Sequence, residues 1–162
     1  MNKTPNLPDD VKKECIAIVQ GYDRRVKKYN NLRREIVEGG GGNYVVLPDP
    51  KNPEDWKKTT WAFNQTSHNA SRTTEDKAAK LLGLEELPDT KRMRAVEKAR
   101  DNIGLDLPPQ LRRKLVKAVM LNCKSGRKYP YKVLDVEGFS ERSFYRERDL
   151  FLLDIAEIIG LL

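Results

Sequence analysis

Two arginines near the C-terminus, Arg142 and Arg146, have the type and spacing of residues that recognise nucleic acid. They are four residues apart, so in a helix they lie on one side, one turn from each other. A guanidinium group can donate two hydrogen bonds to the acceptors of a guanine in the major groove, and serine or tyrosine hydroxyls can bind phosphate. With Asp149 on the same side and Ser143 and Tyr145 flanking it, this surface is a candidate DNA contact.

The opposite side of the same segment is apolar, as the inner face of a packed helix must be. It is formed by Phe144, Phe151, Ile155, Ile158, Ile159 and Leu162. Arg148 falls near this face, and its long side chain can extend along the helix edge to keep the charge in water. Ser140 is a suitable N-cap, so we predict a helix from Ser140 to the end of the chain.

A short helix and a glycine turn precede that segment. Residues 132–136 are predicted to be helical, and Gly138 can take the positive φ that a tight turn between two helices requires. Val133, Phe139 and Phe144 are placed to meet in a small core between the helices. This order of elements is the outline of a helix-turn-helix, in which the second helix carries the two arginines.

Basic residues are concentrated before this unit. Between Lys91 and Lys117 there are nine basic residues and three acidic ones, and the whole chain of 162 residues has a net charge of +7. Such an excess favours a polyanion as the partner and is typical of phosphate contacts. The candidate phosphate-contacting residues are Arg112, Arg113, Lys124, Arg127, Lys128 and Lys132.

Other kinds of chemistry have little support. Two cysteines and one histidine, His68, are too few for a disulfide framework or a metal site, and no P-loop or dinucleotide fingerprint is present. We therefore expect no enzyme, no catalytic residue, no metal and no cofactor. No apolar run approaches about 18 residues and the first ten lack a signal core, so we expect a cytoplasmic protein without a membrane partner.

The N-terminal part predicts one long amphipathic helix. Apolar residues recur at three- and four-residue steps over residues 9–37, with Arg25 interrupting them, and Cys15, Tyr22, Tyr29 and Ile36 are seven apart. This seam can pack on the rest of the chain or pair with a second copy, and the sequence leaves both open.

The predicted organisation has three parts: an N-terminal helix or oligomerisation arm (1–38), a Gly/Pro-rich linker (39–52) and a helical DNA-binding domain (53–162). Residues 44–47 are strand-like but have no evident pairing partner, so we expect an extended loop there. A helix carrying Trp56 and Trp61 is expected to follow. The predicted fold class is all-α, a helical bundle that ends in a helix-turn-helix at about residues 130–160.

The C-terminal motif resembles a known family. Residues 138–146 read Gly-Phe-Ser-Glu-Arg-Ser-Phe-Tyr-Arg, similar to the G-[YF]-S-x-R-[ST]-F-Y-R signature of phage late-operon transcriptional regulators of the ArpU and RinA type. Residues 74–81, 93–99 and 107–109 also resemble segments of that family, and residues 32–42 do so loosely. The likeness covers residues 74–162.

The resemblance implies a sigma-factor region-four-like helix-turn-helix and binding to double-stranded DNA near a phage promoter. It implies activation of late genes, packaging genes included, with host RNA polymerase as a further partner. By position, it places Ser140, Arg142, Ser143, Tyr145 and Arg146 at the DNA. Two alternatives stay open: a packaging adaptor like a terminase small subunit, and an assembly protein that binds no DNA.

Overall fold

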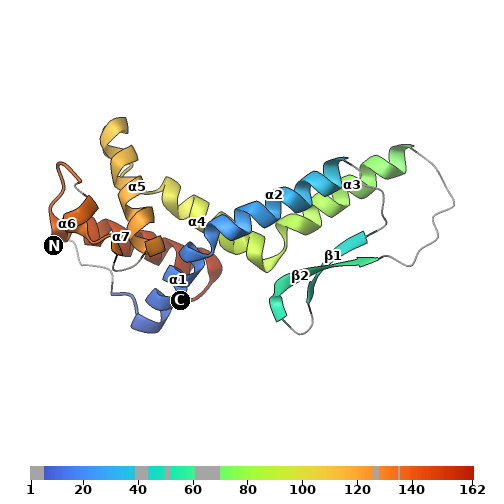
Figure 1. The fold of residues 1–162 in the computed structure, drawn as a ribbon, viewed down its shortest axis with the longest axis horizontal. Coiled ribbons are helices and arrows are strands. Elements are labelled where there is room, and N and C mark those ends of the chain that lie inside the picture. Colours follow the sequence, from blue (N-terminus) through green and yellow to red (C-terminus); the bar gives the residue numbers. More distant parts are fainter. Residues whose placement is uncertain (1–5, 39–43, 50–51, 61–69, 126–127, 135) are drawn as a thin grey trace. The chain divides into compact units, whose positions relative to one another are not determined.

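A computed structural model describes residues 6–38, 44–49, 52–60, 70–125, 128–134 and 136–162 (Figure 1). The helices are α1 (Asp9–Gln20), α2 (Tyr22–Glu38), α3 (Ala70–Glu85), α4 (Pro88–Asp101), α5 (Pro109–Ser125), α6 (Tyr131–Leu134) and α7 (Glu141–Ile159). The strands β1 (Tyr44–Asp49) and β2 (Asn52–Thr60) form one small antiparallel sheet. The fold class is all-α, as predicted, because helices supply nearly all of the side chains that form the buried cores. None of the helices within the described ranges is both long and apolar enough to cross a membrane.

The chain forms two compact units, and their boundaries differ from the predicted ones. Unit 1 contains residues 1–23 and 92–162, and unit 2 contains residues 24–91. The prediction of a separate N-terminal arm is wrong for α1, which packs against α5 and α7 within unit 1. The reason is a break in the predicted helix at Gly21, whose N–H closes the end of α1 on the Ala17 carbonyl at 3.1 Å.

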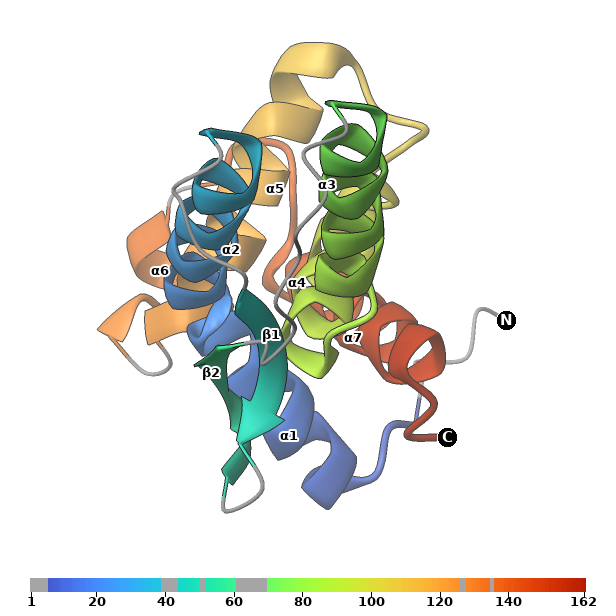
Figure 2. The ribbon, with the colours of Figure 1, turned by 90° about the vertical axis from the view of Figure 1, so that its right-hand side faces the viewer.

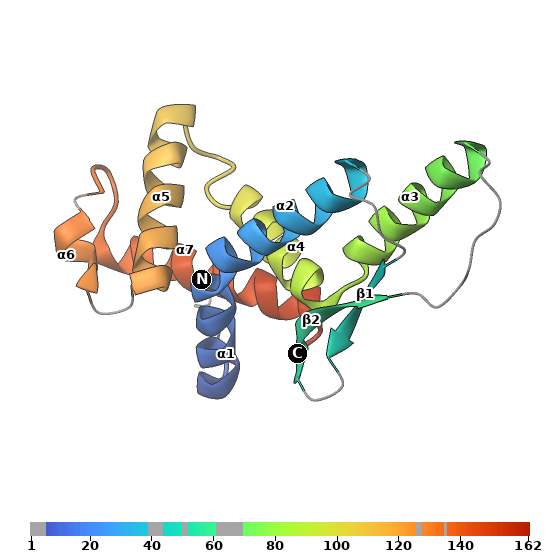
Figure 3. The ribbon, with the colours of Figure 1, turned by 45° about the vertical axis from the view of Figure 1, so that its right-hand side comes forward.

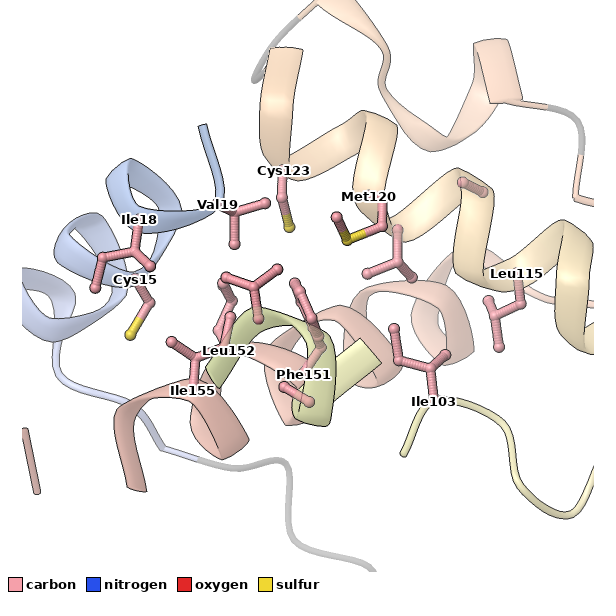
Figure 4. Packing of buried hydrophobic residues seen from close by; sticks show 14 of the residues in the cluster. Cys15, Ile18, Val19, Ile103, Leu115, Met120, Cys123, Phe151, Leu152 and Ile155 are labelled. Atoms are coloured by element: carbon pink, nitrogen blue, oxygen red, sulfur yellow. The ribbon is translucent and has the colours of Figure 1, made fainter. Parts of the chain in front are cut away.

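The core of unit 1 lies where α1, α5 and α7 meet. Figure 4 shows side chains from the three helices converging: Cys15, Ile18, Val19, Met120, Cys123, Phe151, Leu152 and Ile155. These residues are all buried, so the apolar side of α1 is covered by its own chain. The apolar side of α1 therefore packs on its own chain and does not pair with a second copy.

The two cysteines, Cys15 and Cys123, belong to this core. Both are buried free thiols. Burial raises the pKa of Cys15 to about 11, with Glu14 adding to the rise, and burial raises that of Cys123 to about 12. Both thiols thus stay protonated at neutral pH, and they act as small apolar side chains.

In unit 2, α2 and α3 run side by side in opposite directions (Figures 1 and 2). A small core of Leu32, Ile36, Leu84 and Leu87 lies between them, with Tyr29 and Leu81 packed at its edge. The four residues that are spaced seven apart in the sequence pack in two separate cores. Cys15 and Tyr22 belong to the core of unit 1, whereas Tyr29 and Ile36 belong to that of unit 2.

Arg25, which interrupts the apolar seam in the sequence, forms a buried ion pair with Asp89. Its Nε donates to Asp89 Oδ1 at 3.0 Å, and both side chains are buried. Asp89 is the second residue of α4, and its carboxylate neutralises the arginine. A buried charge is costly unless it is paired, and this pair joins α2 to the first turn of α4.

The segment between α2 and α3 corrects two predictions. Residues 44–49 are strand β1 rather than a loop, and residues 52–60, which include Trp56, are strand β2 rather than a helix. The strands are in register from Tyr44 opposite Thr60 to Pro48 opposite Trp56. Trp61, the glycines of the predicted linker and most of the polar segment that follows β2 lie outside the described residues.

Candidate nucleic-acid interface

The segment predicted to be a helix-turn-helix contains the four-residue helix α6 and the 19-residue helix α7 (Figure 3). Gly138 has φ +84°, the left-handed conformation expected of it. Ser140 caps α7 as predicted, since its Oγ accepts a hydrogen bond from the Ser143 N–H at 3.2 Å. The turn and the first residue of the second helix are therefore set by local chemistry that the sequence makes visible.

Aromatic contacts hold α6 against α7. The Tyr131 ring lies 5.6 Å from the fully buried Phe144 ring, and the Tyr131 hydroxyl donates to the Phe139 carbonyl. The Tyr145 ring meets the Phe144 ring edge-on at 5.3 Å. The predicted small core thus exists around Phe144, but Tyr131 is a member that the sequence analysis missed.

Three apolar residues were placed wrongly. Val133 is 60% exposed rather than buried between the helices, and Val136 takes the inner position instead. At the end of α7, Ile158 and Leu162 are exposed although they were assigned to the inner face. The helix ends at Ile159, and the apolar pattern continues past the last residue that α7 buries.

Three of the five predicted contact residues are exposed at the start of α7: Ser140, Arg142 and Ser143. Ser140 and Ser143 hold each other, with their hydroxyl oxygens 2.9 Å apart. Arg142 is on the first turn of the helix, on the side away from Phe144 and Phe151. Its guanidinium is thus presented to solvent from a capped, fixed helix terminus.

The other two predicted contact residues, Tyr145 and Arg146, are half-buried. The Tyr145 hydroxyl lies 3.5 Å from the Tyr131 backbone N–H, and the Arg148 guanidinium lies over its ring at 4.8 Å. Arg146 has its Nε enclosed without a hydrogen-bond partner among the described residues. Tyr145 is therefore placed to support the helix pair, and Arg146 is less accessible than Arg142.

A polar network fixes α7 to the rest of unit 1. Arg148 donates to Asp149 at 3.0 Å and to the buried Asn122 Oδ1 at 3.3 Å, and Asn122 donates to the Tyr129 carbonyl at 2.8 Å. Asp149 also pairs with Lys12 of α1 at 3.0 Å. Asp149 was expected on the DNA side, but it is engaged in this network. Arg148 lies near the inner face as predicted, but its guanidinium contacts Asp149 and Asn122 instead of extending into water.

The predicted phosphate-contacting residues separate into two groups. Arg112 donates to the Ile103 and Asp101 carbonyls after and at the end of α4, and Lys124 pairs with Asp23 at 2.8 Å, so both have structural partners. Arg113, Lys128 and Lys132 are exposed. Arg127 lies outside the described residues. The exposed group keeps its charge available to a polyanion.

Within the described residues, no group of three His, Cys, Asp or Glu side chains is arranged to hold a metal ion. Comparisons with protein-family models, with curated proteins and with solved structures find no match to the chain.

Proposed function

We propose that this protein is a sequence-specific double-stranded DNA-binding regulator of transcription, with α7 as its reading helix. The observation that carries the proposal is the division of α7 into two sides. Phe144, Phe151 and Ile155 are buried, while Arg142 and Ser143 are exposed at the capped N-terminal turn. In helix-turn-helix proteins this turn of the second helix meets base edges in the major groove.

The surrounding charges support the same proposal. Lys132 is exposed on α6, the first helix of the pair, and Lys128 precedes it. On α5, Arg113 is exposed, and α5 contains no acidic residue. Cations on the elements flanking a reading helix suit phosphate contacts, which position a protein on the duplex but carry no sequence information.

The resemblance of residues 138–146 to phage late-operon regulators gives the proposal its biological form. We infer an activator of phage late genes that acts in the host cytoplasm, with host RNA polymerase as a second partner. This part of the proposal depends on the motif, whereas the DNA contact depends also on exposure and charge at α7.

The proposal is tested best at Arg142. We expect Arg142→Ala to fold like the parent and to lose discrimination by about 5- to 150-fold at one base position, because a bidentate contact to guanine contributes about 1–3 kcal/mol. Arg142→Lys should lose much of the same discrimination, since an ammonium cannot reproduce the two-pronged contact. The measurement is a competition titration of a duplex selected from a random-sequence pool against unselected duplex.

Lys13→Ala is the matched control, since it removes one exposed positive charge from α1, far along the chain from α7. It should leave discrimination unchanged. If Arg142→Ala and Lys13→Ala discriminate equally well while both are folded, α7 is not the reading helix. Arg146 is a poorer test position because its half-buried side chain would mix binding with stability.

A further inference from the structure

The exposed side of α2 in unit 2 has an unusual composition. Every exposed residue between positions 24 and 34 is arginine, lysine or asparagine. These six residues, here called the α2 basic face, are Arg24, Lys27, Asn30, Asn31, Arg33 and Arg34. None of them belongs to the basic tract that leads into the helix-turn-helix.

The charge of this face is not balanced within unit 2. Of the three acidic residues of α2, Asp23 is exposed and pairs with Lys124 at 2.8 Å, Glu35 is half-buried, and Glu38 lies beyond the face. Across the described residues, no ion pair involves the four cations of the face. The neighbouring helix α3, by contrast, contains three basic and three acidic residues. An ordinary solvated helix pair would be expected to mix both signs on both helices.

Contacts on the opposite side of α2 fix the direction of the face. Arg25 pairs with Asp89 at 3.0 Å, and the Tyr29 hydroxyl donates to Glu85 Oε1. Further along, Lys77 Nζ donates to the Val37 carbonyl at 3.4 Å. From position 25 to 29 to 37 of α2, the partner residue moves back from 89 to 85 to 77, each time by as many residues as the position on α2 advances. This is an antiparallel pairing in one register, so α2 cannot turn its cations toward α3.

We propose that the α2 basic face binds the phosphate backbone of duplex DNA, as a second contact surface on a different unit from the reading helix. Ten residues of helix span about 15 Å, and a duplex carries about nine phosphate charges over that length. Guanidinium, ammonium and side-chain amide groups all donate hydrogen bonds to phosphate oxygens. The face lacks apolar anchors, so it suits a polyanion better than it suits a protein surface. The proposal rests on duplex DNA being the ligand of the proposed function.

The test is a triple variant of the full chain, Arg24→Gln with Lys27→Gln and Arg34→Gln. The probe is a fluorescent 40-bp duplex of random sequence, titrated at several salt concentrations. Loss of three phosphate contacts should reduce the slope of log K against log salt by about 2 to 3 and weaken binding at low salt by about tenfold or more. The charge-preserving control, Arg24→Lys with Arg34→Lys, should keep the slope of the parent.

The outcomes separate this inference from the proposed function. A triple variant that melts like the parent, loses slope and still discriminates selected from unselected duplex supports a phosphate contact on α2. If its slope and affinity equal those of the parent while Arg142→Ala loses discrimination, the α2 face is overturned and the reading helix stands. An unchanged slope combined with loss of binding to a partner protein would also overturn it, in favour of a protein contact on this face. If the triple variant loses slope while Arg142→Ala discriminates normally, the α2 contact stands and the reading helix is wrong.

Discussion

A chain that begins at Tyr22, and so lacks α1, should not form a stable unit 1. The deletion removes Cys15, Ile18 and Val19, which are buried against α5 and α7, and it also removes the Lys12 partner of Asp149. Burial of an apolar side chain contributes about 1.5–3 kcal/mol, so three represent about 4.5–9 kcal/mol. The whole stability of a typical domain is about 5–15 kcal/mol. We expect the loss of a cooperative melting transition for unit 1, measured by circular dichroism.

The control keeps α1 and changes its exposed side. Lys13→Ala with Glu14→Ala alters two exposed residues of the same helix, and its melting temperature should stay close to that of the parent. A truncated chain that melts cooperatively at the parent temperature would show that α1 is a separable arm after all. That result would restore the division of the chain that the sequence suggested.

Replacing Phe144 by alanine should destabilise unit 1 by about 3–5 kcal/mol. The side chain is fully buried and contacts the rings of Tyr131 and Tyr145, so its removal leaves a cavity at the junction of α6 and α7. For a domain of about this size, such a loss lowers the melting temperature by at least about 10 °C. Urea unfolding of the two chains measures the difference directly.

Phe144→Leu is the graded comparison, because leucine keeps most of the apolar volume and should cost less than alanine. Both variants should bind DNA in proportion to the fraction folded, unlike Arg142→Ala, which should be folded and discriminate less well at one base position. If Phe144→Ala melted like the parent, the packing of α6 on α7 would not depend on this residue. The assignment of the two sides of α7 would then be wrong.

The C-terminal helix pair was predictable because its signals are local. The Ser140 cap, the positive φ of Gly138 and the burial of Phe144 and Phe151 each follow from residue type and spacing within about ten positions. Pro109 at the first position of α5 is a local start signal of the same kind. Exposure at the start of α7 follows from the same periodicity.

The errors arose where distant residues decide the structure. Periodicity could not reveal the break at Gly21, because the seam continues through it and is shared by two cores. Arg25 looked like an interruption because its partner, Asp89, is 64 positions away. Strand β2 has the composition of a polar segment with a proline, and only its pairing with β1 makes it a strand.

The candidate site shows the same limit. Sequence position put Arg112, Lys124 and Asp149 among the residues facing DNA, yet each has a structural partner from another segment. The residues around each charge in the sequence do not indicate that such a distant partner exists. The α2 basic face was missed for a related reason, since the exposed side of α2 is known only when α3 covers the other side.

The most direct measurement of the central claim is the salt dependence of binding between the full chain and a 40-bp duplex. Fluorescence anisotropy between 50 and 200 mM salt gives the slope of log K against log salt. Neutralisation of about five phosphates predicts a slope near −4 to −5. Absence of binding at 50 mM salt, or an affinity that does not change with salt, would contradict the claim that duplex DNA is the partner of this protein.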